Sequence, residues 1–275
     1  MDLRAALETP LDTVGLLEVV PELALARELE GSLYHHLDTL DHVLEVVRGV
    51  ECELDEGRVG ARVGEDSVQG LRLAALLHDV AKPVTRGELE GRVLFVSHDS
   101  LGAGMVRRIG RRLGLSAWET DLTATLTALH LKIGFMGNPR TDYPPERLAR
   151  AAGPFGEELA VLSWADRLAA QGPRLKPEHL RRHEDLCTWF LRVSRELGPY
   201  PDPDYAALGV TISSAASDAD VGYAASYIRL LVGRGAGGEN SALARLAVRH
   251  LPVEDPGGGR VESRRERSHS WGRRR

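Results

Sequence analysis

Cysteine and aromatic residues are scarce in this chain of 275 residues. Its two cysteines, Cys52 and Cys187, are too few for a disulfide framework or a zinc cluster built from cysteines. This count fits a reducing, cytoplasmic setting. Aromatic residues make up 5% of the chain, whereas alanine, leucine, valine and arginine are abundant. That composition favours helices over sheets.

Long hydrophobic runs are also lacking. No apolar stretch approaches the roughly 20 residues that a membrane-spanning helix needs, so we expect no contact with a membrane. The first residues, MDLRAALETPLD, do not have the basic and then apolar layout of a secretion signal. We therefore expect a cytoplasmic protein, and its hydrophobic content of 43% is ordinary for a globular core.

A strong positive charge is missing from the chain as a whole. The formal net charge is -5, which argues against a general nucleic-acid binder. The last twenty residues nevertheless hold seven arginines and two glutamates, in the stretch PGGGRVESRRERSHSWGRRR. Because this segment has no periodic apolar face, we predict a disordered tail. It is either a solubilising terminus or a contact for RNA or another polyanion.

Apolar residues recur at helical spacing along most of the chain, and no alternation of strands and helices is visible. A two-residue Glu-Gly link in ELEGRVLFVSH predicts a short β-hairpin near 88–96. The charged residues 50–66 are expected to form a loop or a poor hairpin, and GPYPDPDYAALG (198–209) is a linker. We predict an all-α protein with helices over 14–29 (with a second piece opening at Pro21), 31–50, 67–78 (capped by Ser67), 99–113, 116–131, 144–152, 155–171, 176–197, 217–233 and 240–250.

These features divide the chain into four predicted parts. Residues 1–30 form a helical lead-in, and residues 31–198 form the main helical domain. Residues 199–252 form a small C-terminal helical extension, and residues 253–275 form the arginine-rich tail.

The stretch LAALLHDVAKPVTRG (73–87) ends an apolar run abruptly in His78 and Asp79, with Lys82 three residues later. A polar helix end is the simple explanation, because a lone histidine there more often satisfies the helix dipole than binds a metal. Asp166 is harder to explain in this way. It lies within the apolar sequence VLSWADRLAA, and burying a carboxylate is costly unless it is paired or binds a metal.

Further histidines occur at the helical positions where a metal site would need them. His42 lies within one predicted helix, His98 opens another and His130 ends a third. Each has an ordinary structural explanation, but His42, His78, Asp79, His98, His130 and Asp166 together supply six ligands. Imidazole and carboxylate suit Fe, Mn, Co, Ni, Zn or Mg better than soft metals.

With this ordered pattern the chain resembles the HD-domain metal-dependent phosphohydrolases. Within them it looks most similar to the HD domain of bacterial tRNA nucleotidyltransferases and poly(A) polymerases. The resemblance covers about residues 14–172. The stretches that carry it are VVPEL, YHHLDTLDHVLEVV, RLAALLHDVAKP, SHDSLGAGMVRRIGRRLGLS and LSWADRLAAQGP.

The resemblance implies an HD-type helical bundle that holds one or two divalent ions, with Mn, Mg, Ni, Co or Fe as candidates. His42, His78, Asp79 and Asp166 would hold the first ion, and Asp79 would bridge to a second ion held by His98 and His130. A water acidified by these ions would attack phosphorus as hydroxide. Lys82 would contact a phosphate oxygen, and Arg86 and Lys132 are weaker candidates for substrate binding.

The expected activity is hydrolysis of a phosphomonoester or phosphodiester, most plausibly of a nucleotide or cyclic nucleotide. Two alternatives use the same ligands: a di-iron oxygenase with the HD fold, and a non-catalytic HD module that binds metal or RNA. Because no room for a nucleotidyltransferase head precedes residue 14, we do not expect nucleotide addition. The expected partner is a small phosphorylated molecule, with RNA and a second copy of the chain as further options.

Overall fold

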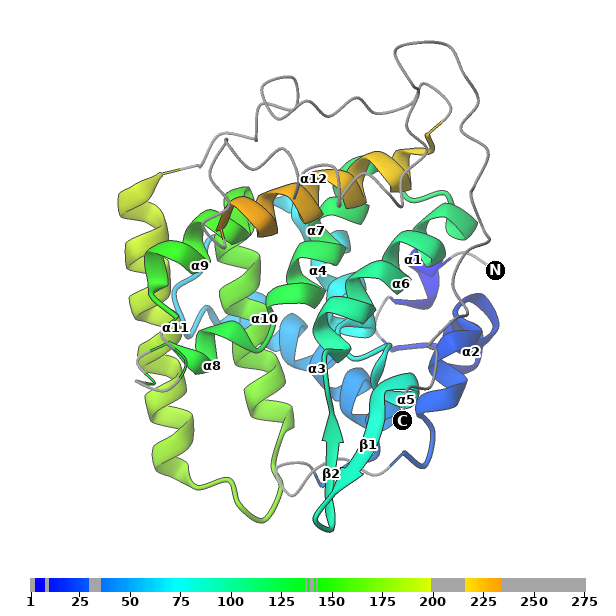
Figure 1. Cartoon of the computed structure of the whole chain (residues 1–275), viewed down its shortest axis with the longest axis horizontal. Helices are drawn as coiled ribbons and strands as arrows, with labels where there is room; N and C mark the ends of the chain where they lie inside the picture. Colours follow the sequence, from blue (N-terminus) through cyan, green and yellow to red (C-terminus); the bar gives the residue numbers. More distant parts are fainter. Residues whose placement is uncertain are drawn as a thin grey trace, which may run out of the picture.

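Helices form almost all of the regular structure in this protein (Figure 1). The computed structural model describes residues 3–7, 10–29, 36–136, 138, 141, 143–198 and 216–233. Within these ranges the one sheet has two strands, which confirms the predicted all-α class. The predicted helix over 240–250, the linker beyond residue 198 and the arginine-rich tail lie outside the described residues.

Short helices begin the chain and bury their apolar side chains in the common core. They are α1 (Leu3–Ala6), α2 (Thr13–Val19) and the 3-10 helix η1 (Pro21–Ala26). Asp12 caps α2 by accepting a hydrogen bond from the Gly15 backbone N–H at 3.0 Å. Pro21 opens η1, as predicted, because its fixed φ suits the first helical position.

Helix α3 (Thr39–Glu56) differs from its prediction at both ends. It begins at Thr39 rather than at residue 31, because the Asp38 carboxylate caps it through the Asp41 N–H at 2.8 Å. The prediction of a loop from residue 50 was also wrong, since the buried face continues through Val50. The buried Glu53 then accepts a hydrogen bond from the Val59 N–H at 2.8 Å, which ties the following loop to the helix.

Helix α4 (Glu65–Leu77) begins earlier than predicted, and Ser67 is not its cap. Gly64 occupies the cap position, and Glu65 and Asp66 lie in the first turn, where acidic residues favour the helix dipole. Ser67 is inside the helix and buried. A serine that directly follows two acidic residues is therefore a poor guide to where this helix starts.

A β-hairpin follows the short helix α5 (Lys82–Thr85) and projects from the bundle (Figure 1). Strand β1 (Arg86–Leu89) pairs antiparallel with β2 (Arg92–Phe95). Glu90 and Gly91 between them both have positive φ, 51° and 70°, as a two-residue type I′ turn requires. The predicted hairpin near 88–96 is confirmed, and it starts two residues earlier.

The remaining helices confirm their predicted positions to within a few residues. They are α6 (His98–Leu113), α7 (Ala117–Leu129), α9 (Pro145–Ala152), the 3-10 helix η2 (Gly153–Phe155), α10 (Gly156–Ala169) and α11 (Pro177–Leu197). Helix α7 starts with a capping box between Ser116 and Glu119. It ends at Leu129 rather than at 131, and a separate short helix, α8 (Lys132–Phe135), follows.

Helix α7 lies in the interior, with α4, α6 and α12 (Asp218–Gly233) packed around it. All its residues from Thr120 to Leu129 are buried, including four threonines. Gly222 lets α12 lie close, because a Cβ there would come within 2.1 Å of the Ala117 carbonyl oxygen. The predicted helix over 217–233 is confirmed, while the division into four parts remains a prediction.

No helix among the described residues is long and apolar enough to cross a bilayer. Both cysteines are free thiols, Cys52 at the surface and Cys187 in the interior.

A buried ion pair joins α12 to α7. The Arg229 guanidinium donates to both carboxylate oxygens of Asp121, at 2.9 and 2.7 Å, and both residues are at most 7% exposed. We predict that Arg229→Met lowers the free energy of unfolding by about 3–5 kcal/mol, because the buried Asp121 carboxylate loses its guanidinium. Urea unfolding measures this change. Arg108→Met, at an exposed position of α6, should change it by less than about 0.5 kcal/mol; equal effects of the two substitutions would contradict the prediction.

Candidate metal centre

The buried end of α4 delivers His78 and Asp79 into the interior. Residues Leu73–Leu77 are at most 3% exposed, so the predicted apolar stem is confirmed. Helix α4 ends at Leu77, and the next two side chains are also buried, His78 at 0% and Asp79 at 1% exposure. A carboxylate at this depth requires compensating positive charge.

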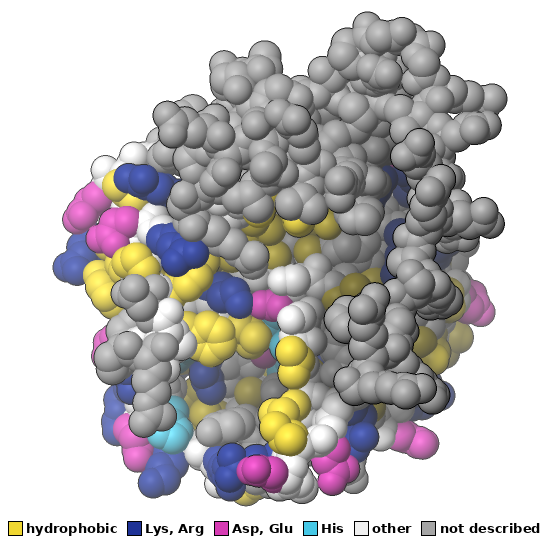
Figure 2. Space-filling model, viewed as in Figure 1, with side chains coloured by type: hydrophobic (Ala, Val, Ile, Leu, Met, Phe, Trp, Pro, Cys, Tyr) yellow, Lys and Arg dark blue, Asp and Glu magenta, His cyan; other side chains and the backbone are white. Residues whose placement is uncertain are grey.

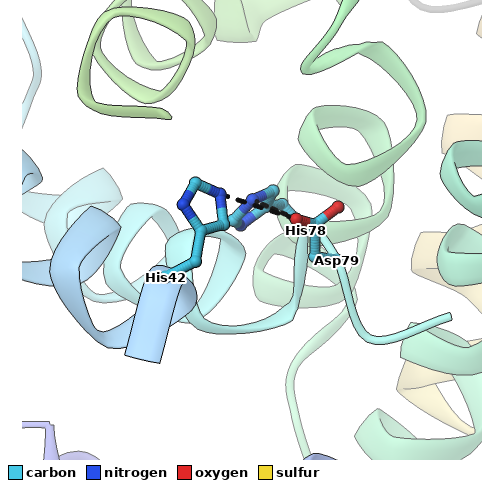
Figure 3. Close-up of side chains that lie close together, drawn as sticks. All are labelled: His42, His78 and Asp79. Carbon is cyan, nitrogen blue, oxygen red and sulfur yellow. Dashed lines mark ion pairs between the residues drawn. The ribbon is translucent and has the colours of Figure 1, made fainter. Parts of the chain in front are cut away.

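One oxygen of Asp79 faces a first group of side chains (Figure 3). Asp79 Oδ2 lies 3.1 Å from His78 Nε2 and 3.6 Å from His42 Nε2, which comes from α3. Asp166 Oδ1 approaches the same group from α10, 3.1 Å from His42 Nε2 and 3.9 Å from His78 Nε2. Residues far apart in the sequence thus meet at one point.

The other oxygen of Asp79 faces a second group. Asp79 Oδ1 lies 3.3 Å from His98 Nε2 and 3.7 Å from His130 Nε2. His98 is the first residue of α6, and His130 follows the last residue of α7. The structure therefore brings together all six side chains that the sequence singles out as candidate ligands.

Backbone carbonyls orient three of these imidazoles in the same way. The Nδ1 atoms of His78, His98 and His130 lie 2.8, 2.7 and 2.8 Å from the carbonyl oxygens of the residues three positions earlier. A carbonyl only accepts hydrogen bonds, so each Nδ1 carries the proton. Each Nε2 consequently faces Asp79, and in the neutral form of the ring its lone pair points there, which is the usual arrangement of a metal-binding histidine.

Packing fixes the spacing of the second group. Helix α6 approaches α7 at Gly102, where a Cβ would come within 2.9 Å of Thr127 Cγ2. This close approach holds the start of α6, and hence His98, beside the end of α7 that carries His130. A larger residue at position 102 would force the two helices apart.

The donor set fits divalent ions. His78 Nε2, His98 Nε2 and Asp79 Oδ1 are buried and make no hydrogen bond with any described residue, and leaving such atoms unsatisfied is costly. Ligand atoms of His42, His78 and Asp79 lie within 4.8 Å of one another, and so do those of Asp79, His98 and His130. Two triads that share one carboxylate could each hold a cation.

The electrostatics of the cluster also favour positive charge. Burial opposes ionisation of Asp79, but the charges of His78 and Lys82 hold its pKa well below the usual range. Burial by itself would raise the pKa of Asp166, but neighbouring histidines outweigh it and keep this pKa low. The pKa of His130 falls to about 4, chiefly through burial and then through the charge of His78, so this imidazole is neutral and free to act as a ligand.

The candidate substrate-binding residues lie in three different settings. Lys82 is buried, with Nζ 2.5 Å from Asp79 Oδ2, so it lies at the centre itself. Lys132 pairs with Asp99 at 2.6 Å. Arg86 is exposed on β1 and forms no ion pair with the cluster in the described part of the chain.

The sequence did not indicate two features of this region. One is the role of Asp99 as the partner of Lys132, because a residue near a helix start is first taken as a cap. The other is a group of basic side chains, Arg167, Arg182 and His183, which lines a pocket of 380 Å³. Arg167 lies on α10 and the other two on α11, and no sequence motif links the two helices.

Known proteins are similar to this chain in sequence. Residues 39–171 match the HD domain family. An A-adding tRNA nucleotidyltransferase of Deinococcus radiodurans is 32% identical over 62% of this chain and 39% of its own length. A CC-adding tRNA nucleotidyltransferase of Thermus thermophilus is 32% identical over 64% of this chain and 38% of its own length.

A bifunctional uridylyltransferase/uridylyl-removing enzyme of Novosphingobium aromaticivorans is 32% identical over 41% of this chain and 12% of its own length. The chain thus spans well under half the length of each of these relatives. The matched region contains all six clustered side chains and the helices that carry them. Residues 39–171 of this chain therefore form an HD domain.

Proposed function

We propose that the protein hydrolyses a phosphoester of a nucleotide with the help of two divalent ions that share Asp79. The observation that supports this most is the division of Asp79 contacts, with Oδ2 toward His42 and His78 and Oδ1 toward His98 and His130. A carboxylate whose two oxygens face separate imidazole pairs suits a bridging ligand in a two-metal site.

In this proposal each residue of the cluster has a defined task. His42, His78 and Asp166 would hold one ion, His98 and His130 would hold the other, and Asp79 would contribute to both. When bound, the ions supply an activated water for attack on phosphorus and neutralise charge on the phosphate oxygens. Backbone carbonyls keep the histidines in the ligand tautomer, and the buried helices exclude bulk water from the centre.

We propose that the Lys82 ammonium exchanges a contact within the protein for a contact with the substrate. Its ammonium lies on Asp79 and 5.5 Å from the centre of the Phe95 ring. A cation bound at Asp79 would repel this ammonium, and a phosphate at the centre would attract it. We therefore propose that Lys82 turns from Asp79 to a phosphate oxygen when metal and substrate are both bound.

The nucleotide as substrate is supported by the names of the relatives. Two of them add nucleotides to tRNA, and the third removes uridylyl groups as one of its two activities. All three names involve nucleotidyl groups, so we propose a nucleotide or cyclic nucleotide as the molecule cleaved. RNA is a larger substrate that contains the same kind of phosphoester bond.

Metal reconstitution tests the reaction class. We predict that protein stripped with a chelator loses hydrolysis of 2′,3′-cyclic nucleotides, nucleoside monophosphates or p-nitrophenyl esters, and that Mn, Ni, Co or Mg restores it. Phosphate release measures the activity. Protein that contains an iron pair, consumes O₂ and leaves every ester intact would instead be the oxygenase with the same ligands.

Substitution of the shared ligand tests the site. Asp79→Asn should lower kcat/KM by more than about 100-fold, because losing even the partners of metal ligands costs 10–100-fold. Asp55→Asn changes an exposed aspartate at the end of α3 and is the matched control. Activity of the Asp79 variant equal to that of the control would place the chemistry elsewhere.

Metal counting tests the sharing itself. We predict that the wild-type chain binds two Mn ions, that Asp79→Asn weakens both sites, and that His98→Gln weakens only one. Calorimetric titration of the stripped protein with Mn measures both occupancies. His179→Gln, an exposed residue of α11, should keep two ions. A full second site in the Asp79 variant would show that Asp79 serves only one ion.

A further inference from the structure

A pocket with only basic charges lies beside the candidate metal centre. It has a volume of 380 Å³ and is lined by Gly134 of α8, Arg167 of α10, Asn138 and four residues of α11, which are His179, Arg182, His183 and Leu186. Figure 2 shows Lys, Arg and His side chains interspersed with Asp and Glu side chains at the lower left of the view.

The two arginines of this pocket are available for a ligand. Neither Arg167 nor Arg182 makes an ion pair or a side-chain hydrogen bond with a residue in the described ranges. By contrast, Arg58 and Arg195 form ion pairs with neighbouring carboxylates. No carboxylate lines the pocket. Two guanidinium groups around one cavity, without an acidic partner, form a site for an oxyanion.

His183 adds a buried acceptor to the same cavity. It is 5% exposed, and its Nε2–H donates to the Ser163 carbonyl oxygen at 3.0 Å. That bond leaves Nδ1 with a lone pair. Burial first, and the charge of Arg167 second, lower the pKa of His183 to about 4, so the ring is neutral near pH 7.

Gly134 lies beside both of these groups. A Cβ at this position would make ordinary van der Waals contact, 3.7 Å from Arg167 Nη2 and 3.9 Å from His183 Nδ1. The guanidinium and one edge of the imidazole ring therefore border the same space next to Gly134. The cavity combines cationic donors with one acceptor, which matches a phosphate group that carries a neighbouring hydroxyl.

The pocket and the metal centre share helix α10, on which Arg167 directly follows Asp166. Gly134 lies four residues after His130, on the short helix that follows α7. Asp166 is close enough to act on the pKa of His183. The two sites are therefore neighbours along α10.

We propose that this pocket is a second phosphate subsite, which binds a non-scissile phosphate of the nucleotide while another phosphate lies at the metal centre. Arg167 and Arg182 hold the phosphate oxygens, and His183 Nδ1 accepts a hydrogen bond from an adjacent ribose hydroxyl. The pocket selects substrates with two phosphates, such as nucleoside bisphosphates or a short RNA. This inference rests on the proposed hydrolysis in treating the bound nucleotide as a substrate. Binding of phosphate in the pocket can be tested without any turnover.

Neighbouring arginines of α11 provide a matched pair for the kinetic test. Both Arg181 and Arg182 are exposed, but only Arg182 lines the pocket. We compare kcat/KM for adenosine 3′,5′-bisphosphate and adenosine 5′-monophosphate. Wild type and Arg181→Gln should prefer the bisphosphate, and Arg182→Gln should lose about 10-fold of that preference, the worth of one charge-assisted hydrogen bond. The same preference in both variants would overturn the proposal.

A binding measurement separates this proposal from the hydrolase. Adenosine 3′,5′-bisphosphate is titrated into the full chain, with and without Mn, while the imidazole NMR signals of His183 and His179 are followed. They should shift in wild type and in Arg181→Gln, and the shift should be lost in Arg182→Gln and in Gly134→Leu, which fills the cavity. Shifts without any turnover would retain the pocket and reject the hydrolase. Turnover with an unmoved His183 signal would reject the pocket and retain the hydrolase.

A short oligonucleotide distinguishes the two sources of the second phosphate. If the trinucleotide pApApA shifts the His183 signal at lower concentration than the bisphosphate does, the pocket follows an RNA backbone. If the bisphosphate is the better ligand, the pocket selects a small nucleotide. Either result supports a phosphate subsite, and the absence of a His183 shift with both ligands contradicts it.

Discussion

The buried carboxylate of Asp79 is the constraint on which the rest of this structure depends. At 1% exposure it cannot be solvated by water, and an isolated charge in such a place would be prohibitively unstable. Imidazoles therefore surround both of its oxygens, and Lys82 contacts one of them. Divalent ions would supply the positive charge that this arrangement favours. Burial of the Asp79 carboxylate therefore destabilises the fold without a cation and favours the binding of a metal ion.

The scaffold holds this cluster by means that are local to each helix. Carbonyl oxygens three residues earlier orient His78, His98 and His130, so each ring is fixed by the helix end or turn that carries it. The relative placement of those helices then comes from packing around α7. Close approach at Gly102 and the buried pair between Arg229 and Asp121 are examples of contacts that keep the helices rigid, which a precise ligand geometry requires.

Most helices and the hairpin could be predicted from the sequence, because apolar spacing and turn residues act over a few positions. The errors have tertiary causes. Helix α3 continues past residue 50 because Val50 and Glu53 find buried partners, and no local pattern reveals this. The α4 cap was misplaced because several adjacent polar residues can occupy that position.

The sequence by itself determined which residues can serve as ligands, since their order and chemical type are properties of the chain. Only the tertiary structure decided how they are shared, with His42 and His78 at one oxygen of Asp79 and His98 and His130 at the other. It also decided that Lys82 contacts Asp79, and that Arg167, Arg182 and His183 line one cavity. The physical reason is that such relations join atoms on different helices, and packing rather than local sequence sets the distances between them.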